Sequence, residues 1–367
     1  MKNVLVSIVS KQTAPNVLFI KEKKPIDYYL FLSTPKMAKN RVTQNIINAT
    51  GIDKNNTETI IVQEDSVEDV INKLKEFYDS QLFGDDIKFF VNITGGTKLM
   101  SIGVYKFFQE KGTAEIYYIP SDKNEYRMIF PVVTHKEHKL EYKLNLEEYF
   151  VSYGLTFKKG APLHNYAYAK ELFDKVIRGK IDIDRFEVIR KLRNKKSKKK
   201  IEVEKLDEEA KILLKEIEYP LKDNVLTKND IKYLSGGWFE EFIFYLYNSY
   251  VKNDKYIGIN ITIKNENVQN ELDISVIHDN IFYNLECKTT LKNDIKGNIL
   301  SETIYKLTAL SRNFGLKTKS FLFTLDDLRD ENGEIEEIHS SRSRVFGVRI
   351  YDRTGILNLL EGKAEKF

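Results

Sequence analysis

The sequence predicts an α/β protein with two domains and a helical connector between them. The N-terminal part alternates short apolar, β-branched runs with stretches whose apolar residues recur at helical spacing, which is typical of a parallel sheet covered by helices on both faces. The C-terminal part reads instead as a helix, three consecutive strands, a helix and a further strand. The chain has 367 residues, of which 42% are hydrophobic and 31% charged. This length favours two domains, and we place them at residues 1–147 and 222–367, with a connector at 148–221.

The composition excludes several classes of protein. The formal net charge is only +4, so any nucleic-acid surface must come from local basic patches. The single cysteine, Cys287, excludes a disulfide scaffold and cysteine-based zinc sites, and it suits a reducing compartment. No apolar run approaches the roughly 20 residues that a membrane helix needs, and the first residues do not resemble a signal peptide. We therefore expect a cytoplasmic protein without a membrane partner.

The N-terminal part is predicted to be Rossmann-like, although its first strand is not followed by the dinucleotide-binding glycine motif. The expected strands lie at 2–10, 27–34, 58–63 and 87–93, the helices near 37–49, 66–82 and 97–112, and an edge hairpin at 114–133.

Two loops of this domain follow the carboxyl ends of strands, where open α/β sheets bind their ligands. In the loop after the fourth strand, glycines let backbone amides approach an anion, the start of the next helix favours negative charge, and a lysine adds a cation. The same residues also fit a tight strand-to-helix turn in which a threonine caps the helix. The loop after the first strand supplies neutral donors and acceptors suited to a base or ribose. The candidate ligand-binding residues are Ser10, Gln12, Asn16, Thr94, Gly95, Gly96, Thr97 and Lys98.

The segment 270–290 carries the clearest chemical signal. Asp279-Asn280 separates two alternating apolar runs, which predicts a β-hairpin with a two-residue turn. That register places Asp273 opposite Glu286, and Lys288 on the same face as Glu286. Like charges directly across a strand pair repel, so a divalent metal between them is the expected reason, with Lys288 to hold or deprotonate a water. The alternative is a solvated hairpin face with ordinary surface charges.

The connector contains a basic run at 190–200. It fits either a solvated connecting segment or a patch that follows phosphates, which would make nucleic-acid binding salt-dependent. Aromatic residues do not interleave with it, so a base-stacking platform is not expected.

The order helix, three strands, helix, strand, together with Asp273 and Glu286-x-Lys288, resembles the PD-(D/E)xK nuclease superfamily. The resemblance implies that Asp273, Glu286 and the backbone carbonyl of Cys287 bind a metal, Mn²⁺ or Mg²⁺, and that Lys288 is the general base or positions the water. A glutamate on the first helix commonly completes such sites. Glu240 fits best, and Glu241 remains an alternative. Leu272 stands where the signature has proline, at a variable position. Lys306 is assigned to packing or to contact with the substrate backbone.

The run Val-Ser-Ile-Val-Ser-Lys-Gln-Thr-Ala-Pro-Asn at 6–16, with Thr-Gly-Gly-Thr-Lys-x-Met at 94–100, resembles CARF domains (CRISPR-associated Rossmann fold). The resemblance implies a homodimer that binds a cyclic oligoadenylate messenger across its twofold axis.

The whole chain resembles the CRISPR ancillary nucleases of type III systems that cyclic tetra-adenylate activates. This implies non-specific cleavage of single-stranded RNA or DNA. The sequence leaves open the preferred nucleic acid, the ring size, and whether the CARF site degrades its own activator. Two alternatives are a constitutive DNA-repair or junction nuclease with an inert dimerising domain, and a ligand-sensing regulator that binds nucleic acid without cutting it.

Overall fold

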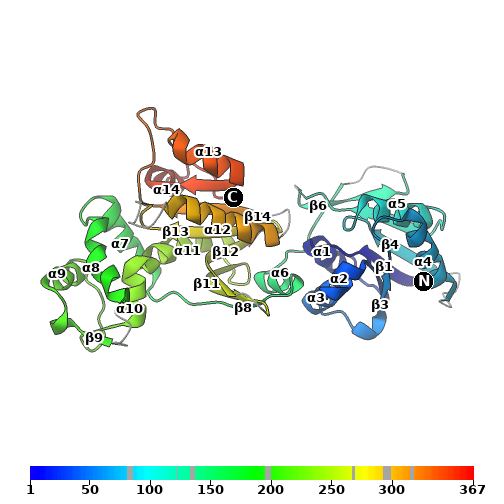
Figure 1. The fold of residues 1–367 in the computed structure, drawn as a ribbon, viewed down its shortest axis with the longest axis horizontal. Coiled ribbons are helices and arrows are strands. Elements are labelled where there is room, and N and C mark those ends of the chain that lie inside the picture. Colours follow the sequence, from blue (N-terminus) through cyan, green and yellow to red (C-terminus); the bar gives the residue numbers. More distant parts are fainter. Residues whose placement is uncertain are drawn as a thin grey trace.

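A computed structural model of the chain describes residues 1–367 apart from 81–85, 122, 133–136, 195–199, 267–268, 292–298 and 315–317. The N-terminal domain lies at one end of the long axis of the molecule, and the rest of the chain forms the other end (Figure 1). Within the described residues, no helix is both long and apolar enough to cross a bilayer. The structure confirms the mixed α/β class.

The N-terminal domain is built on a seven-stranded sheet in the order β3-β2-β1-β4-β5-β6-β7. The first five strands in this order run parallel, and β6 and β7 are antiparallel additions at one edge. All four predicted parallel strands and the predicted hairpin are present. The strands are β1 (Lys2–Ile8), β2 (Tyr28–Ser33), β3 (Thr57–Ile61), β4 (Ile87–Asn92), β5 (Ala114–Tyr118), β6 (Glu125–Phe130) and β7 (Glu137–Lys139).

Helices cover both faces of this sheet because alternate residues of the central strand point to opposite sides. Leu5 belongs to the apolar cluster that includes α1 and α3, whereas Val4 and Val6 belong to the cluster under α4 and α5. Helix α1 was not among the predicted helices. The helices are α1 (Ala14–Glu22), α2 (Pro35–Lys39), α3 (Val42–Thr50), α4 (Val67–Ser80) and α5 (Lys98–Gln109).

The C-terminal domain is built on a six-stranded sheet in the order β15-β14-β13-β12-β11-β8. The predicted succession of helix, three strands, helix and strand is present, and a further helix, strand and helix follow it. Helix α11 packs on the face that carries Ile274 and Leu285, and α12 packs on the face that carries Leu322. The elements are α11 (Trp238–Val251), β11 (Ile257–Lys264), β12 (Gln269–His278), β13 (Ile281–Lys288), α12 (Ile299–Asn313), β14 (Thr318–Thr324), α13 (Glu337–Phe346), β15 (Val348–Tyr351) and α14 (Arg353–Leu360).

The segment between these two sheets is largely helical, as expected, and it packs on the C-terminal domain. Strand β8 pairs with β11, and the rings of Phe173 and Phe242 stack 3.9 Å apart where α7 meets α11. The segment is therefore an integral layer of that domain. It comprises α6 (Leu146–Ser152), β8 (Thr156–Lys158), α7 (Tyr166–Ile177), α8 (Glu187–Arg190), β9 (Lys200–Glu202), α9 (Glu208–Glu216), β10 (Val225–Thr227) and α10 (Lys228–Lys232).

The two domains meet through a continuous apolar cluster. It joins Leu5 and Phe19 of the N-terminal domain to Phe282 and Phe314 of the C-terminal domain. Tyr149 of α6 lies within it and stacks on Phe282, with ring centroids 4.8 Å apart. Side chains packed as closely as in a protein core resist small displacements, so this cluster fixes how the domains sit against each other.

Candidate functional site

The hairpin register is the one predicted from the two-residue turn. Ile274 pairs with Leu285 and His278 with Ile281, and both turn residues have positive φ, which matches the turn type expected for Asp-Asn. Asp273 and Glu286 are the next residues beyond the Ile274–Leu285 pair.

The face that carries these carboxylates is not solvated, which rules out the reading as an ordinary surface hairpin. Ser275 and Asn284 on this face are 0% and 1% exposed, and Glu286 is 1% exposed. A buried carboxylate requires a charge partner and hydrogen bonds, because desolvating the ion alone costs several kcal/mol. The buried carboxylate of Glu286 is therefore expected to have cationic neighbours.

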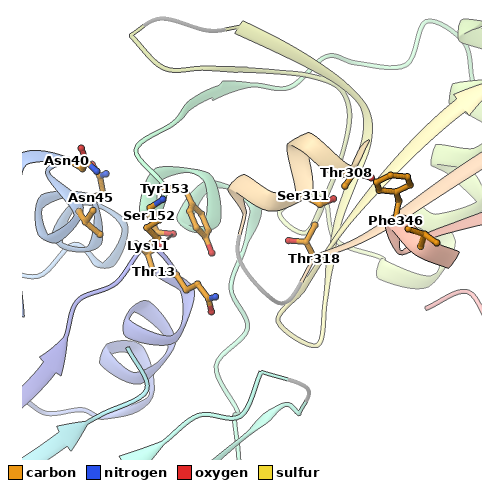
Figure 2. Close-up of a pocket in the computed structure, with 13 residues that line it drawn as sticks. Lys11, Thr13, Asn40, Asn45, Ser152, Tyr153, Thr308, Ser311, Thr318 and Phe346 are labelled. Atoms are coloured by element: carbon orange, nitrogen blue, oxygen red, sulfur yellow. Dashed lines mark hydrogen bonds between the residues drawn. The ribbon is translucent and has the colours of Figure 1, made fainter. Parts of the chain in front are cut away.

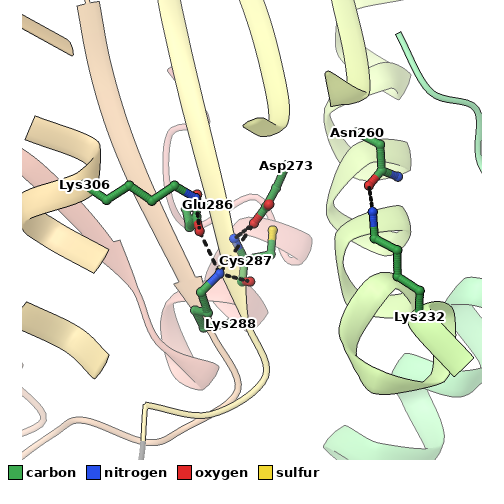
Figure 3. Close-up of polar contacts among 7 residues, drawn as sticks. All are labelled: Lys232, Asn260, Asp273, Glu286, Cys287, Lys288 and Lys306. Atoms are coloured by element: carbon green, nitrogen blue, oxygen red, sulfur yellow. Dashed lines mark hydrogen bonds and ion pairs between the residues drawn. The ribbon is translucent and has the colours of Figure 1, made fainter. Parts of the chain in front are cut away.

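The ammonium group of Lys288 lies among the three predicted metal ligands (Figure 3). Its Nζ is 2.7 Å from Oε1 of Glu286, 3.4 Å from the carbonyl oxygen of Cys287 and 3.9 Å from Oδ2 of Asp273. The backbone amide of Cys287 also donates to Oδ2 of Asp273 at 2.8 Å, which fixes that carboxylate against the neighbouring strand. Three oxygen donors from two strands thus converge on one cation.

A second lysine contacts the same glutamate. Nζ of Lys306, on α12, lies 2.9 Å and 3.0 Å from the two carboxylate oxygens of Glu286 (Figure 3). The sequence pattern did not predict this contact, because the helical spacing of α12 shows only which residues face the core. The feature that could have pointed to this contact is the exposed position of Lys306 on a helix that covers the hairpin.

Burial and neighbouring carboxylates raise the pKa values of Glu240 and Asp273. Burial, followed by the charge of Asp273, raises the pKa of Glu240 to about 8. Burial and the charge of Glu286 raise the pKa of Asp273 to about 6. Burial alone would lower the pKa of Lys288, but Asp273 and Glu286 outweigh it and raise this pKa. The carboxylates are therefore held where full ionisation is unfavourable, and a further cation would favour their charged forms.

Glu240 and Glu241 lie in different surroundings. Glu240 interacts electrostatically with Asp273 and lines the same cleft as Cys287. The carboxylate of Glu241 accepts hydrogen bonds from the backbone amides of Leu163 and His164. Only Glu240 therefore shares the environment of the predicted metal ligands.

The donor set suits a hard divalent cation. Carboxylate and carbonyl oxygens are the ligands that Mg²⁺ and Mn²⁺ prefer, and Lys288 shows that these oxygens already surround a cation. In the described part of the chain, no group of three His, Cys, Asp or Glu side chains is close enough to form a metal site by itself.

The site adjoins a cleft of about 590 Å³, whose lining includes four basic side chains and the acidic side chains of Asp184, Glu187 and Glu240. Arg190, Arg193 and Lys232 line it together with Glu240 and Lys288. Nη2 of Arg190 donates to the hydroxyl of Thr289 at 2.9 Å. The first part of the basic run thus faces the candidate active site, whereas residues 195–199 lie outside the described residues. This placement favours the phosphate-following reading of that run.

In the N-terminal domain, the two candidate loops flank the switch point between β1 and β4, where strand order reverses. A Cβ atom on Gly95 would collide with the carbonyl oxygen of Ile8, and Gly96 has φ of +78°. Thr97 caps α5 by accepting from the amide of Met100. These contacts confirm the tight capped turn, which leaves Lys98 exposed at the helix start.

The other candidate residues divide between exposed and buried positions. The hydroxyl of Thr94 donates to Asn92 at 2.6 Å and accepts from the amide of Ile119 at 2.8 Å. Ser10 and Gln12 are partly exposed. Asn16 is 0% exposed, and its amide group donates to the hydroxyl of Ser7 and the carbonyl of Ile8, both at 2.9 Å. Asn16 thus braces the end of β1 and does not reach the surface.

Two adjoining cavities open beside these loops. The larger, about 740 Å³, is lined by Lys11, Gln12 and Thr13 on the N-terminal side. Figure 2 shows Thr308, Ser311 and Thr318 of the C-terminal domain across this space from Thr13 and Ser152. The smaller cavity is lined by Gln12 and Thr94 together with Phe314 of the C-terminal domain. Both domains therefore enclose the space beside the predicted ligand residues.

Comparison with known protein families assigns both domains. Residues 4–149 match the family model of the Card1 CARF domain, and residues 227–357 match that of the Card1-like endonuclease domain. The chain belongs to the Card1-like CARF endonucleases. Both matches confirm the resemblances inferred from the two loops and the hairpin. A search of curated protein sequences finds no significant match to this chain.

Three solved structures share the fold over nearly the whole length of this chain. Protein VC1899 from Vibrio cholerae aligns with a TM-score of 0.75 at 15% identity, covering 98% of this chain and 97% of that one. Can2 from Sulfobacillus thermosulfidooxidans, solved with cyclic tetra-adenylate, aligns with a TM-score of 0.73 at 21% identity and 98% coverage of both chains. A type III CRISPR defence DNA nuclease activated by cyclic oligoadenylate aligns with a TM-score of 0.59 at 15% identity, covering 94% of this chain and 52% of that one.

Proposed function

We propose that this CARF endonuclease is a metal-dependent nuclease of type III CRISPR defence that a cyclic oligoadenylate, cyclic tetra-adenylate in the first instance, switches on. The observation that carries the proposal is the convergence of Asp273, Glu286 and the carbonyl of Cys287 on one cation, the ammonium of Lys288. That donor set lies in a domain of the endonuclease family and beside a CARF domain.

In the active state, Asp273, Glu286 and the carbonyl of Cys287 would hold Mn²⁺ or Mg²⁺, with Glu240 completing the set. The bound ion would supply a Lewis acid for the phosphoryl oxygen and lower the pKa of its water. The ammonium of Lys288, 2.7 Å from Glu286, is placed to hold and orient the attacking water by donating a hydrogen bond to it. Glu286 and Lys288 are adjacent on one strand face, so one rigid strand positions both groups.

The substrate is proposed to be single-stranded RNA or DNA, cut with little sequence preference. Arg190, Arg193 and Lys232 offer the cleft cationic groups suited to phosphates, although Asp184 and Glu187 also line it and Glu187 pairs with Arg190 at 3.4 Å. The described lining residues of the cleft include no aromatic side chain, so bases have no stacking platform there. Contacts to the backbone alone carry no sequence information.

The messenger is proposed to bind at the β1 and β4 loops through Ser10, Gln12, Thr94 and Lys98, with Gly95, Gly96 and Thr97 shaping the turn and Asn16 bracing β1. A homodimer would present two copies of this half-site across its twofold axis, which suits a symmetric ring. Can2, which shares the fold, was solved with cyclic tetra-adenylate.

The test uses purified full-length protein, labelled single-stranded RNA and DNA, Mn²⁺, and cyclic tetra- or hexa-adenylate. Cleavage should require both the metal and a messenger, and Glu286→Ala should abolish it. Equal cleavage without messenger would point to the constitutive repair-type nuclease. Binding of nucleic acid without cleavage under every condition would point to the regulator. Full activity in Glu286→Ala would overturn the assignment of the site.

A further inference from the structure

Helix α12 touches both candidate sites of the chain. Its C-terminal half carries Thr308 and Ser311, which line the 740 Å³ cavity beside the messenger loops. Lys306, two residues before Thr308, contacts both carboxylate oxygens of Glu286 at 2.9 Å and 3.0 Å. One helix therefore forms a wall of the interdomain cavity and also neutralises a predicted metal ligand.

We infer that α12 is part of the messenger site and that the Lys306–Glu286 contact is an autoinhibitory lock which the messenger releases. This inference rests on the proposed function. It assigns a ligand-binding role to nuclease-domain residues and a regulatory role to a lysine that the sequence pattern did not connect with the metal site.

The hydroxyl groups on α12 define which part of the messenger they can bind. Thr308 donates its proton to the carbonyl of Ile304 at 2.7 Å, and Ser311 donates to that of Leu307 at 2.8 Å. Ser311 also lies 2.6 Å from the hydroxyl of Ser320, so its oxygen has less free capacity than that of Thr308. A hydroxyl that donates its proton within its own helix faces a ligand as an acceptor. The amino group of adenine is a donor and fits these oxygens, whereas a phosphate oxygen does not. Lys11, exposed on the opposite wall, suits a phosphate of the ring.

The end of α12 is also connected to the loop at Thr13 through α6. The hydroxyl of Tyr149 donates to the carbonyl of Phe314, just after α12, at 2.7 Å. Ser152 donates to the carbonyl of Tyr149 at 2.8 Å and lies 2.8 Å from the hydroxyl of Thr13. A ligand that displaces the loop at Thr13 therefore acts on α12 through α6 as well as by direct contact.

The lock follows from competition between cations for Glu286. In the resting state two ammonium groups, those of Lys288 and Lys306, share this carboxylate. A divalent ion must displace at least part of that pairing before it binds. A movement of α12 that withdraws Lys306 frees the carboxylate, so messenger and metal should strengthen each other's binding by the same factor.

The first experiment measures Mn²⁺ affinity of the full-length protein by the electron paramagnetic resonance signal of free Mn²⁺, with and without cyclic tetra-adenylate. We expect the messenger to tighten Mn²⁺ binding by a factor in the range of about 5 to 150. Lys306→Met should bind Mn²⁺ tightly without messenger and lose most of this response. The control is Lys215→Met, an exposed lysine on α9, which should behave as wild type. Unchanged Mn²⁺ affinity in Lys306→Met would overturn the lock.

The second experiment measures messenger affinity by calorimetry for wild type, Thr308→Val and Ser311→Ala. The control Ser249→Ala removes a hydroxyl that makes the same kind of helix-internal bond, to Leu246 at 2.7 Å, on an exposed site. Both cavity variants should bind cyclic tetra-adenylate more weakly, and should discriminate less against cyclic tetra-inosinate, which lacks the amino group. Wild-type affinity and discrimination in both variants would overturn the composite site. Absence of binding to the wild type would instead contradict the proposed sensor function itself.

Discussion

Glu240→Gln should stabilise the metal-free protein while it removes metal-dependent cleavage. Burial and the charge of Asp273 raise the pKa of Glu240 to about 8 from an ordinary value of 4.5. Each unit of pKa shift corresponds to about 1.36 kcal/mol, so the ionised carboxylate opposes folding by a free energy on the order of a few kcal/mol above pH 8. A buried glutamine amide costs part of this gain, and we expect a net stabilisation of about 2 to 3 kcal/mol.

The pH dependence of this stabilisation follows from proton binding by Glu240. Between pH 4.5 and 8 the folded protein holds a proton on Glu240 that the unfolded chain has released, so wild-type stability falls as pH rises through this window. The advantage of Glu240→Gln should therefore be absent near pH 4.5, grow across the window and level off above pH 8.

The assay is thermal unfolding in chelator at pH 5, 7 and 8.5, followed by cleavage assays with Mn²⁺ and messenger. Glu209→Gln, at an exposed position of α9, is the stability control. Glu241→Gln is the activity control and should keep cleaving, because Glu241 accepts backbone amides away from Asp273. Excess Mn²⁺ should raise the unfolding temperature of wild type far more than that of Glu240→Gln. A Glu240→Gln variant that is less stable than wild type at pH 8.5 and still cleaves would refute the place of Glu240 in the acidic cluster.

Three further predictions follow from other parts of the chain. Arg193→Ala should weaken the binding of single-stranded nucleic acids equally for unrelated sequences. It should also reduce the slope of log affinity against log salt concentration by about 1, measured by fluorescence anisotropy. An unchanged slope would show that Arg193 does not contact the substrate. Gly95→Ala should destabilise the protein by about 1 to 3 kcal/mol and lower messenger affinity, because the added Cβ collides with the carbonyl of Ile8. Gly112→Ala meets open space but is strained by its φ of +64°, so it should also be destabilised and yet retain messenger affinity. Burial lowers the pKa of His164, so folding stability should fall as pH decreases below about 6.5, and His164→Gln should flatten that part of the thermal unfolding profile; an identical profile would contradict the burial effect.

The geometry of the hairpin could be predicted because a two-residue turn fixes the register of both strands. Once Asp279 and Asn280 occupy the turn, the positions of Asp273 and Glu286 follow by counting. Counting could not show that this face is buried, since the cover comes from α12, which follows later in the chain. The packing of α12 on the sheet places Lys306, so its contact with Glu286 could not be predicted from residue spacing in the sequence.

Helix α1 was missed for a different reason. Residues 16–20 are all buried, so the segment shows no alternation between an apolar and a polar face, and periodicity gives no signal for a helix surrounded by protein. Pro15 in the first turn was the available cue. Its omission matters for the site, because α1 carries Asn16 inward and away from the ligand surface.

The shared core is the reason that the N-terminal domain is poorly described as an inert dimeriser. A domain that serves only to bring two nucleases together needs no packed contact with the catalytic sheet, yet Leu5 and Phe19 belong to the same apolar cluster as Phe282 and Phe314. Phe282 lies on the strand that carries Glu286, and Phe314 follows the helix that carries Lys306. Packed cores shift between discrete arrangements more readily than they deform continuously. We therefore expect a ligand that alters the domain contact to rearrange the elements that hold Glu286 as well, which would couple the nuclease site to the state of the cavity beside it.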